Sequence, residues 1–129
     1  MVARFVPERK IFTVLHLDYY NPPKGLLLAA TVRGSFKAVV ELYNMGYYRK
    51  VATVLCESLE GAVVLTQDDW MGNPGVVAVD ELSKDGCRST TVGDILVMDD
   101  QEAFSVGIGG VFEPLPLILR ADHRTSAHI

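Results

Sequence analysis

A single amphipathic segment, residues 35–46, limits what this chain can fold into more than any other feature of the sequence. Its apolar residues recur at the spacing i, i+3, i+4 and i+7, as Phe36, Val39, Val40 and Tyr43. Ser35 precedes them as an N-cap, and Gly46 follows them as a C-terminal stop. The pattern predicts a short helix with one apolar face, and such a helix has to pack on a sheet.

Several short apolar runs have the length and composition of β-strands. Residues 11–17 and 51–56 are rich in β-branched types, and the second run is apolar enough to lie centrally in a sheet. Residues 92–98 and 103–108 flank a polar turn, which predicts a β-hairpin. Residues 26–32 fit either a strand or a buried helix by periodicity, and the Thr-Val ending of that run favours a strand.

The middle of the chain combines a second helix with a long irregular stretch. Ser58 is placed to cap a helix that ends near residue 67. Residues 70–89 carry two turn signals around a short apolar piece at 76–79. A loop of this length is unusual in a small domain and tends to be functional, which directs attention to residues 68–94.

Together these elements predict an α+β fold. We expect a single two-layer domain over residues 1–119, with a mostly antiparallel sheet, two helices on one face and a C-terminal β-hairpin. The apolar run 115–119 could close an edge of that sheet. Residues 120–129 read as a flexible tail in which His123 and His128 have no fixed partner.

Composition excludes several classes of protein. A formal net charge of −4 argues against a nucleic-acid binder, which usually carries a basic face. No apolar run approaches the roughly 20 residues of a membrane span, and the first residues do not resemble a signal peptide. Cys56 and Cys87 predict neither a disulfide nor a metal site, so we expect a cytoplasmic protein without cofactor or metal.

The densest polar cluster lies just before the predicted hairpin, at Arg88, Ser89, Thr90, Thr91 and Asp94. A guanidinium, several hydroxyls and backbone N–H groups near a glycine can together hold a phosphate or carboxylate. The alternative is structural, because Asp, Ser and Thr in such a segment also hydrogen-bond the backbone of their own turn. Both interpretations stay open at this point.

Two aromatic features also permit more than one interpretation. Trp70, followed by Asn73, could stack on a planar ligand or anchor a partner, or Trp70 could pin the loop onto the core. The tyrosines at 19–20, 43 and 47–48 lie near Arg49 in the sequence and could accept nucleotide bases, although tyrosines commonly pack at element ends. His16, within an apolar strand, is typical of a satisfied interior histidine.

Part of the sequence resembles a family. Residues 47–54 and 58–67, then Trp70 with Asn73-Pro74, and finally Arg88-Ser-Thr-Thr-Val-Gly-Asp-Ile95 are similar to segments of a group of small uncharacterised phage and plasmid proteins. Those proteins carry a Trp…Asn-Pro segment followed by Arg-Ser-Thr-Ser-Val-Gly-Asp-Val/Ile. The similarity spans about residues 43–112, and position 91 is Thr where the group tends to have Ser. The resemblance implies an accessory protein of a mobile element, acting in a host cytoplasm, and it brings no catalytic residues.

Three functions follow from these features. The first is a non-enzymatic binding protein that uses residues 68–94 to hold a protein partner, such as a host factor, or a small anionic ligand. The second is a structural, homo-oligomeric or virion-associated protein, since the apolar run 115–119 could cover a neighbour. The third is an enzyme or sequestering protein for a small phosphorylated ligand. Arg88, Ser89 and Thr90 would hold the phosphate, and Asp94 or Asp69 would act as general base.

Overall fold

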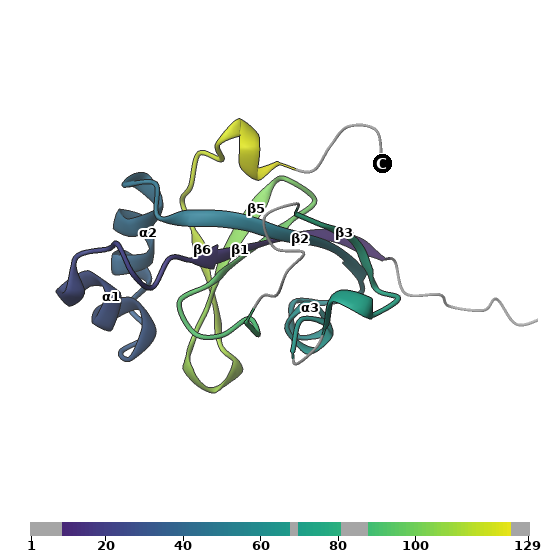
Figure 1. Cartoon of the computed structure of the whole chain (residues 1–129), viewed down its shortest axis with the longest axis horizontal. Helices are drawn as coiled ribbons and strands as arrows, with labels where there is room; N and C mark the ends of the chain where they lie inside the picture. The colour runs from purple at the N-terminus through teal and green to yellow at the C-terminus, as the bar shows by residue number, and fades with distance from the viewer. Residues whose placement is uncertain (1–8, 68–69, 81–87, 125–129) are drawn as a thin grey trace, which may run out of the picture.

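The computed structural model describes residues 9–67, 70–80 and 88–124. These residues form one six-stranded antiparallel sheet with the order β3-β2-β1-β4-β5-β6 (Figure 1). The strands are β1 (Lys10–Leu17), β2 (Tyr48–Cys56), β3 (Val76–Val79), β4 (Ile95–Met98), β5 (Glu102–Val106) and β6 (Phe112–Leu115). The helices are α1 (Lys24–Thr31), α2 (Phe36–Asn44) and α3 (Leu59–Leu65). The predicted α+β class and the C-terminal hairpin, which is β4–β5, are confirmed.

Each face of the sheet carries its own hydrophobic cluster. Leu15 pairs with Ile95 across β1 and β4 and belongs to a first cluster, together with Ala30 of α1 and Leu42 of α2. The preceding residue, Val14, belongs to a second cluster that contains other buried residues: Phe12, Val54, Ala62 of α3, Trp70 and Leu96. Since successive strand residues point to opposite faces, α1 and α2 cover one face and α3 covers the other.

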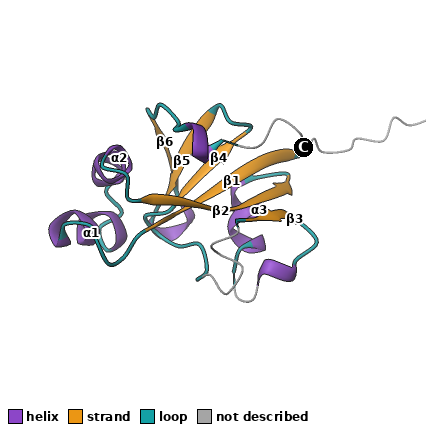
Figure 2. Cartoon of the chain, turned by 45° about the horizontal axis from the view of Figure 1, so that its top comes forward, coloured by secondary structure: helices purple, strands orange, loops and turns teal. Residues whose placement is uncertain are grey.

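This arrangement corrects the expectation that the two predicted helices share one face. Those helices are α2 and α3, and they contribute to different clusters. In Figure 1 and Figure 2, α1 lies beside α2 at one end of the sheet, whereas α3 lies apart from them beside β2 and β3. The physical reason is that β1, β2 and β4 are apolar on both faces, so both faces need cover.

The expected strand at 26–32 is wrong, because these residues belong to helix α1. Leu26 and Ala30, four residues apart, face the first cluster, whereas Leu28 is about half exposed. That spacing is helical, since a strand would bury alternate residues. Pro23 stands immediately before the helix, where its fixed φ suits a helix start, and its carbonyl accepts the first helical hydrogen bond from Leu27.

The two helix caps read from the sequence are confirmed. The Ser35 hydroxyl accepts a hydrogen bond from the amide of Ala38, and the Ser58 hydroxyl accepts one from the amide of Gly61. The short apolar piece at 76–79 is the edge strand β3. The opposite edge is β6, which ends at Leu115, so the expected edge strand at 115–119 is displaced towards the N-terminus.

The segment after β6 is anchored to the domain as far as it is described. The His123 side chain is buried, and its Nδ1 lies 3.0 Å from the hydroxyl of Tyr43. The same hydroxyl accepts a hydrogen bond from the amide of Arg120 at 2.9 Å. The expectation that His123 has no fixed partner is therefore wrong, because Tyr43 of α2 offers an oxygen that serves both groups. His128 lies outside the described residues.

No helix in the described part of the chain is long and apolar enough to cross a membrane.

Candidate functional site

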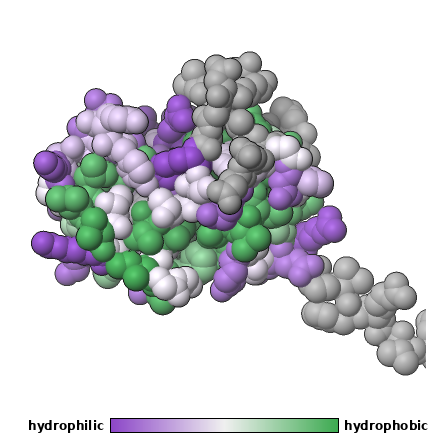
Figure 3. All heavy atoms as spheres, turned by 60° about the horizontal axis from the view of Figure 1, so that its bottom comes forward, coloured by the Kyte–Doolittle hydropathy of each residue, from purple (hydrophilic) through white to green (hydrophobic). Residues whose placement is uncertain are grey.

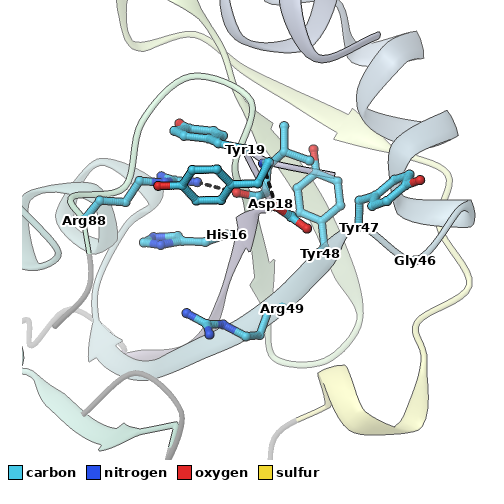
Figure 4. Close-up of a pocket in the computed structure, with 10 residues that line it drawn as sticks. His16, Asp18, Tyr19, Gly46, Tyr47, Tyr48, Arg49 and Arg88 are labelled. Atoms are coloured by element: carbon cyan, nitrogen blue, oxygen red, sulfur yellow. Dashed lines mark hydrogen bonds between the residues drawn. The ribbon is translucent and has the colours of Figure 1, made fainter. Parts of the chain in front are cut away.

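A pocket of about 570 Å³ lies beside the C-terminal end of β1 and the start of β2 (Figure 4). It is lined by residues 16–20 at the end of β1 and after it, residues 46–49 before and at the start of β2, and Arg88. These segments meet because β1 and β2 pair antiparallel, with Leu17 opposite Tyr48. The residues after β1 and those before β2 therefore come to the same end of the sheet.

Asp94 lies behind the pocket and holds two of its lining residues, Arg88 and Leu17, by hydrogen bonds. Its side chain is fully buried, and its two oxygens accept hydrogen bonds from both terminal guanidinium nitrogens of Arg88, at 2.6 and 2.7 Å. They also accept the backbone amides of Leu17 at 3.0 Å and Thr91 at 2.8 Å. A carboxylate has about four lone-pair positions, so these four hydrogen bonds saturate it.

The turn around Gly93 brings Asp94 to that position. Gly93 has a φ of 96°, which favours glycine, and a Cβ atom there would lie 3.3 Å from the carbonyl oxygen of Ala30 in α1. The Tyr48 hydroxyl donates a hydrogen bond of 2.6 Å to the Gly93 carbonyl, and burial raises the pKa of that hydroxyl. Tyr48 therefore supports the loop as a neutral donor.

Arg88 is committed to the same network. Besides the two bonds to Asp94, its guanidinium donates to the carbonyls of Leu17 at 3.0 Å and Ser89 at 3.1 Å. The guanidinium carbon lies 4.1 Å from the centre of the Tyr19 ring, which is a cation–π contact. The bidentate ion pair joins the two ends of the loop, and the hydrogen bonds of Asp94 and Arg88 with the Leu17 backbone fasten the loop to β1.

Thr90 and Thr91, two other predicted site residues, make hydrogen bonds that hold this loop in place. Thr90 is buried, its amide donates to the Thr66 carbonyl at 3.0 Å, and its carbonyl accepts from the Gln67 side chain at 2.8 Å. The Thr90 hydroxyl lies 2.9 Å from Nε2 of His16. Thr91 is exposed and contributes its amide to Asp94, as described above.

The structure brings Trp70 to this loop but not to the pocket. Its side chain is buried among the second cluster, and its indole N–H donates to the Arg88 carbonyl at 3.2 Å. Asn73 lies in the turn before β3, where its side-chain oxygen accepts the amide of Gly75. Neither residue lines the pocket, so the geometry matches the alternative in which Trp70 pins the loop to the core.

His16 lies on the pocket wall between charged neighbours. Burial is the largest influence and lowers its pKa to about 4. Asp94, whose nearer oxygen lies 3.8 Å from Nε2, acts in the opposite direction, and the guanidinium groups of Arg88 and Arg49 lower the pKa further. The His16 ring is consequently neutral near pH 7.

Of the residues that line the pocket, only Arg88 belongs to the site predicted from the sequence, and Tyr20, Tyr47 and Arg49 are among those that do not. Tyr20 is 95% exposed, Tyr47 is half-buried, and Arg49 is exposed. Arg49 stands directly opposite His16 in the β1–β2 register, and no hydrogen bond or ion pair engages its side chain among the described residues. The available signal was the pair of tyrosine doublets at 19–20 and 47–48, which become neighbours only once β1 and β2 pair.

We also searched the described residues for a metal site and for a reactive cysteine. No group of three or more His, Cys, Asp or Glu side chains gathers there in a way that could hold a metal ion. Cys56 is a half-buried thiol whose pKa is raised, chiefly by burial. Asp69 and Cys87 lie outside the described residues.

Comparisons with models of protein families, with curated proteins and with solved structures found no match.

Proposed function

We propose that the chain is a non-enzymatic binding protein that holds a small ligand in the pocket between β1, β2 and the 88–94 loop. The observation that carries this proposal is the pocket itself. Its volume of about 570 Å³ lies in the range typical of small-molecule sites, and its walls combine tyrosine rings with guanidinium groups. Tyr20 and Arg49 are open to solvent on its rim, so a ligand can reach them.

Binding is favoured over catalysis by the state of the polar groups around the pocket. Asp94, the general base considered from the sequence, is buried with both oxygens occupied by donors. The Nε2 atom of His16 already faces the Thr90 hydroxyl. A general base has to reach the proton that it removes, and these two groups are directed inward instead.

In this proposal the 88–94 loop supports the pocket, while residues 16–20 and 46–49 contact the ligand. A phage or plasmid accessory protein, as the resemblance implies, would use such a pocket to sequester or sense a host metabolite. The contribution of the loop is indirect because its charged side chains satisfy one another.

The test is thermal unfolding of the full chain with a panel of nucleotides, phosphosugars, aromatic acids and metal ions. A ligand at 100 times its Kd adds about 2.7 kcal/mol to folding, which is several degrees in Tm for a domain of this size. Compounds that raise Tm are then mapped by amide chemical shifts, which we expect to change at residues 16–20 and 46–49. If no compound raises Tm or shifts those amides, the proposal fails and a protein partner becomes the leading alternative.

A second candidate, self-association, is favoured by a separate observation. Val32, Phe36, Ile108 and Val111 are each 41–65% exposed, and the Ile108 side chain lies against the turn at Gly34 between α1 and α2. Figure 3, a view from the lower side of Figure 1, shows apolar residues interspersed with polar ones across that face. Exposed apolar side chains that gather on one face are typical of protein interfaces. Light scattering at micromolar concentration tests it, and a monomer contradicts it.

A further inference from the structure

We propose that the pocket takes a planar aromatic molecule that carries a phosphate or carboxylate group, with the anion held by Arg49 and the ring held by the tyrosines. This inference rests on the proposed binding function and names the chemical class of the ligand.

The positive charge that a ligand can use belongs to Arg49. The charge of Arg88 is matched by the buried carboxylate of Asp94, at 2.6 and 2.7 Å. Arg49, in contrast, has no hydrogen bond or ion pair among the residues that the structure describes, although it lines the same pocket. A guanidinium with its donors available binds phosphate or carboxylate in a bidentate manner.

The opposing charge in the pocket is Asp18, which lies close enough to Arg49 to interact with it electrostatically, although its hydrogen bonds tie it to its own turn. One oxygen accepts the backbone amides of Tyr20 at 2.7 Å and Asn21 at 3.3 Å, and the other accepts the Asn21 side chain at 2.6 Å. These donors are local, so the carboxylate is directed toward residues 20–21. An anionic group is therefore best accommodated on the Arg49 side, beside His16.

The two ends of the pocket differ in chemistry. Figure 4 shows the side chains of Arg88, His16 and Arg49 on one side of the pocket and the Tyr47 ring on the other. Tyr20, from the loop after β1, adds an almost fully exposed ring to the lining. A ligand that spans the pocket thus meets guanidinium groups on one side and the Tyr47 ring on the other. Aromatic side chains stack on planar rings of many kinds, which suits a nucleobase or another flat heterocycle.

The experiment titrates the full chain with three probes: adenosine 5′-monophosphate, adenosine, and inorganic phosphate. Amide chemical shifts report where each probe binds. We expect the monophosphate to bind most tightly and to shift amides at 16–20 and 47–49. Arg49→Gln should weaken that binding about tenfold or more, since one charge-assisted contact is lost. Arg33→Gln, which removes an exposed arginine outside the pocket, should change it less than about twofold.

Each other outcome has a defined meaning. If adenosine binds as tightly as its monophosphate, or if Arg49→Gln leaves the affinity unchanged, the role of Arg49 is overturned while the pocket still functions as a binding site. If none of the three probes shifts the pocket amides, the inference is overturned, and the wider ligand panel decides the proposed function separately. Shifts confined to residues far from the pocket also overturn it.

Discussion

Two arginines line one pocket, and their surroundings differ in almost every respect. Arg88 is fastened by four hydrogen bonds to a buried carboxylate and two carbonyls, and it covers the Tyr19 ring. Arg49 lies at the start of β2, exposed and without a hydrogen bond or ion pair in the described residues. On the side of the pocket formed by the 88–94 loop, which we call the loop wall, the polar groups satisfy one another. On the side formed by the start of β2, which we call the strand wall, the Arg49 side chain is open to solvent. An arginine whose donors are satisfied by a buried carboxylate stabilises the fold, whereas an arginine whose donors are open to solvent is available to a ligand.

The largest effect that would test this contrast is expected from Asp94→Ala. The substitution leaves the Arg88 guanidinium and the amides of Leu17 and Thr91 without their acceptor. Breaking a buried ion pair from one side costs about 3–5 kcal/mol, so urea unfolding should show a loss of that order. Glu113→Ala removes an exposed carboxylate of β6 as a control and should stay within about 0.5 kcal/mol of wild type. Equal effects of the two substitutions would contradict the assignment of the loop wall as structural.

The pH dependence of the unfolding free energy tests the same network through His16, whose Nε2 lies 2.9 Å from the Thr90 hydroxyl of the loop. The pKa of His16 is lowered by burial to about 4, so the unfolded chain binds the extra proton first as the pH falls below about 6.5. Stability contributed by the neutral ring is therefore present above pH 6.5 and is lost between pH 6.5 and 4, on the order of 3 kcal/mol at most. Unfolding in urea at pH 7, 5.5 and 4.5 measures it.

His16→Gln should flatten part of that pH dependence. His123, whose pKa is also lowered chiefly by burial, contributes in the same direction, so the remaining slope should diminish further in a variant that replaces both histidines. A slope that is unchanged in the double variant would show that other groups control acid stability.

An intermediate effect is expected where the C-terminal segment meets α2. Tyr43→Phe removes the hydroxyl that accepts the Arg120 amide and lies 3.0 Å from Nδ1 of His123. Leaving buried polar groups without a partner costs about 1–3 kcal/mol. Hydrogen exchange should show faster exchange at residues 120–124, and Tyr20→Phe, at an exposed ring, serves as the control. Unchanged exchange in Tyr43→Phe would contradict the anchoring role of that hydroxyl.

The smallest effect on stability is expected from Arg49→Gln, the substitution with the largest expected effect on binding. Because Arg49 is exposed and unpaired in the described structure, its removal should change the unfolding free energy by less than about 0.5 kcal/mol, as should Arg33→Gln. Thermal unfolding without ligand measures this difference. A loss comparable to that of Asp94→Ala would remove the distinction between the two walls.

Local signals in the sequence predicted the elements that local chemistry controls. Ser35 and Ser58 cap helices where the sequence placed them, and the hairpin turn forms at Asp99 and Asp100, both with positive φ. The cluster at 88–94 was also recognised, and its members do converge. The sequence alone favours a strand at 26–32 because a short apolar run fits both periodicities, and packing on the first cluster makes the segment a helix.

The sequence by itself determined the α+β class, the capped helices and the hairpin, because caps, turns and apolar periodicity act over a few residues. Long-range contacts, in contrast, leave Arg88 partly buried and paired with Asp94 while Arg49 is exposed. Residues 16–20, 46–49 and 88 lie far apart along the chain, and the β1–β2 register together with the Arg88–Asp94 pair brings them around one pocket. Which side chains share a cavity depends on such long-range pairing, and no local pattern carries that information.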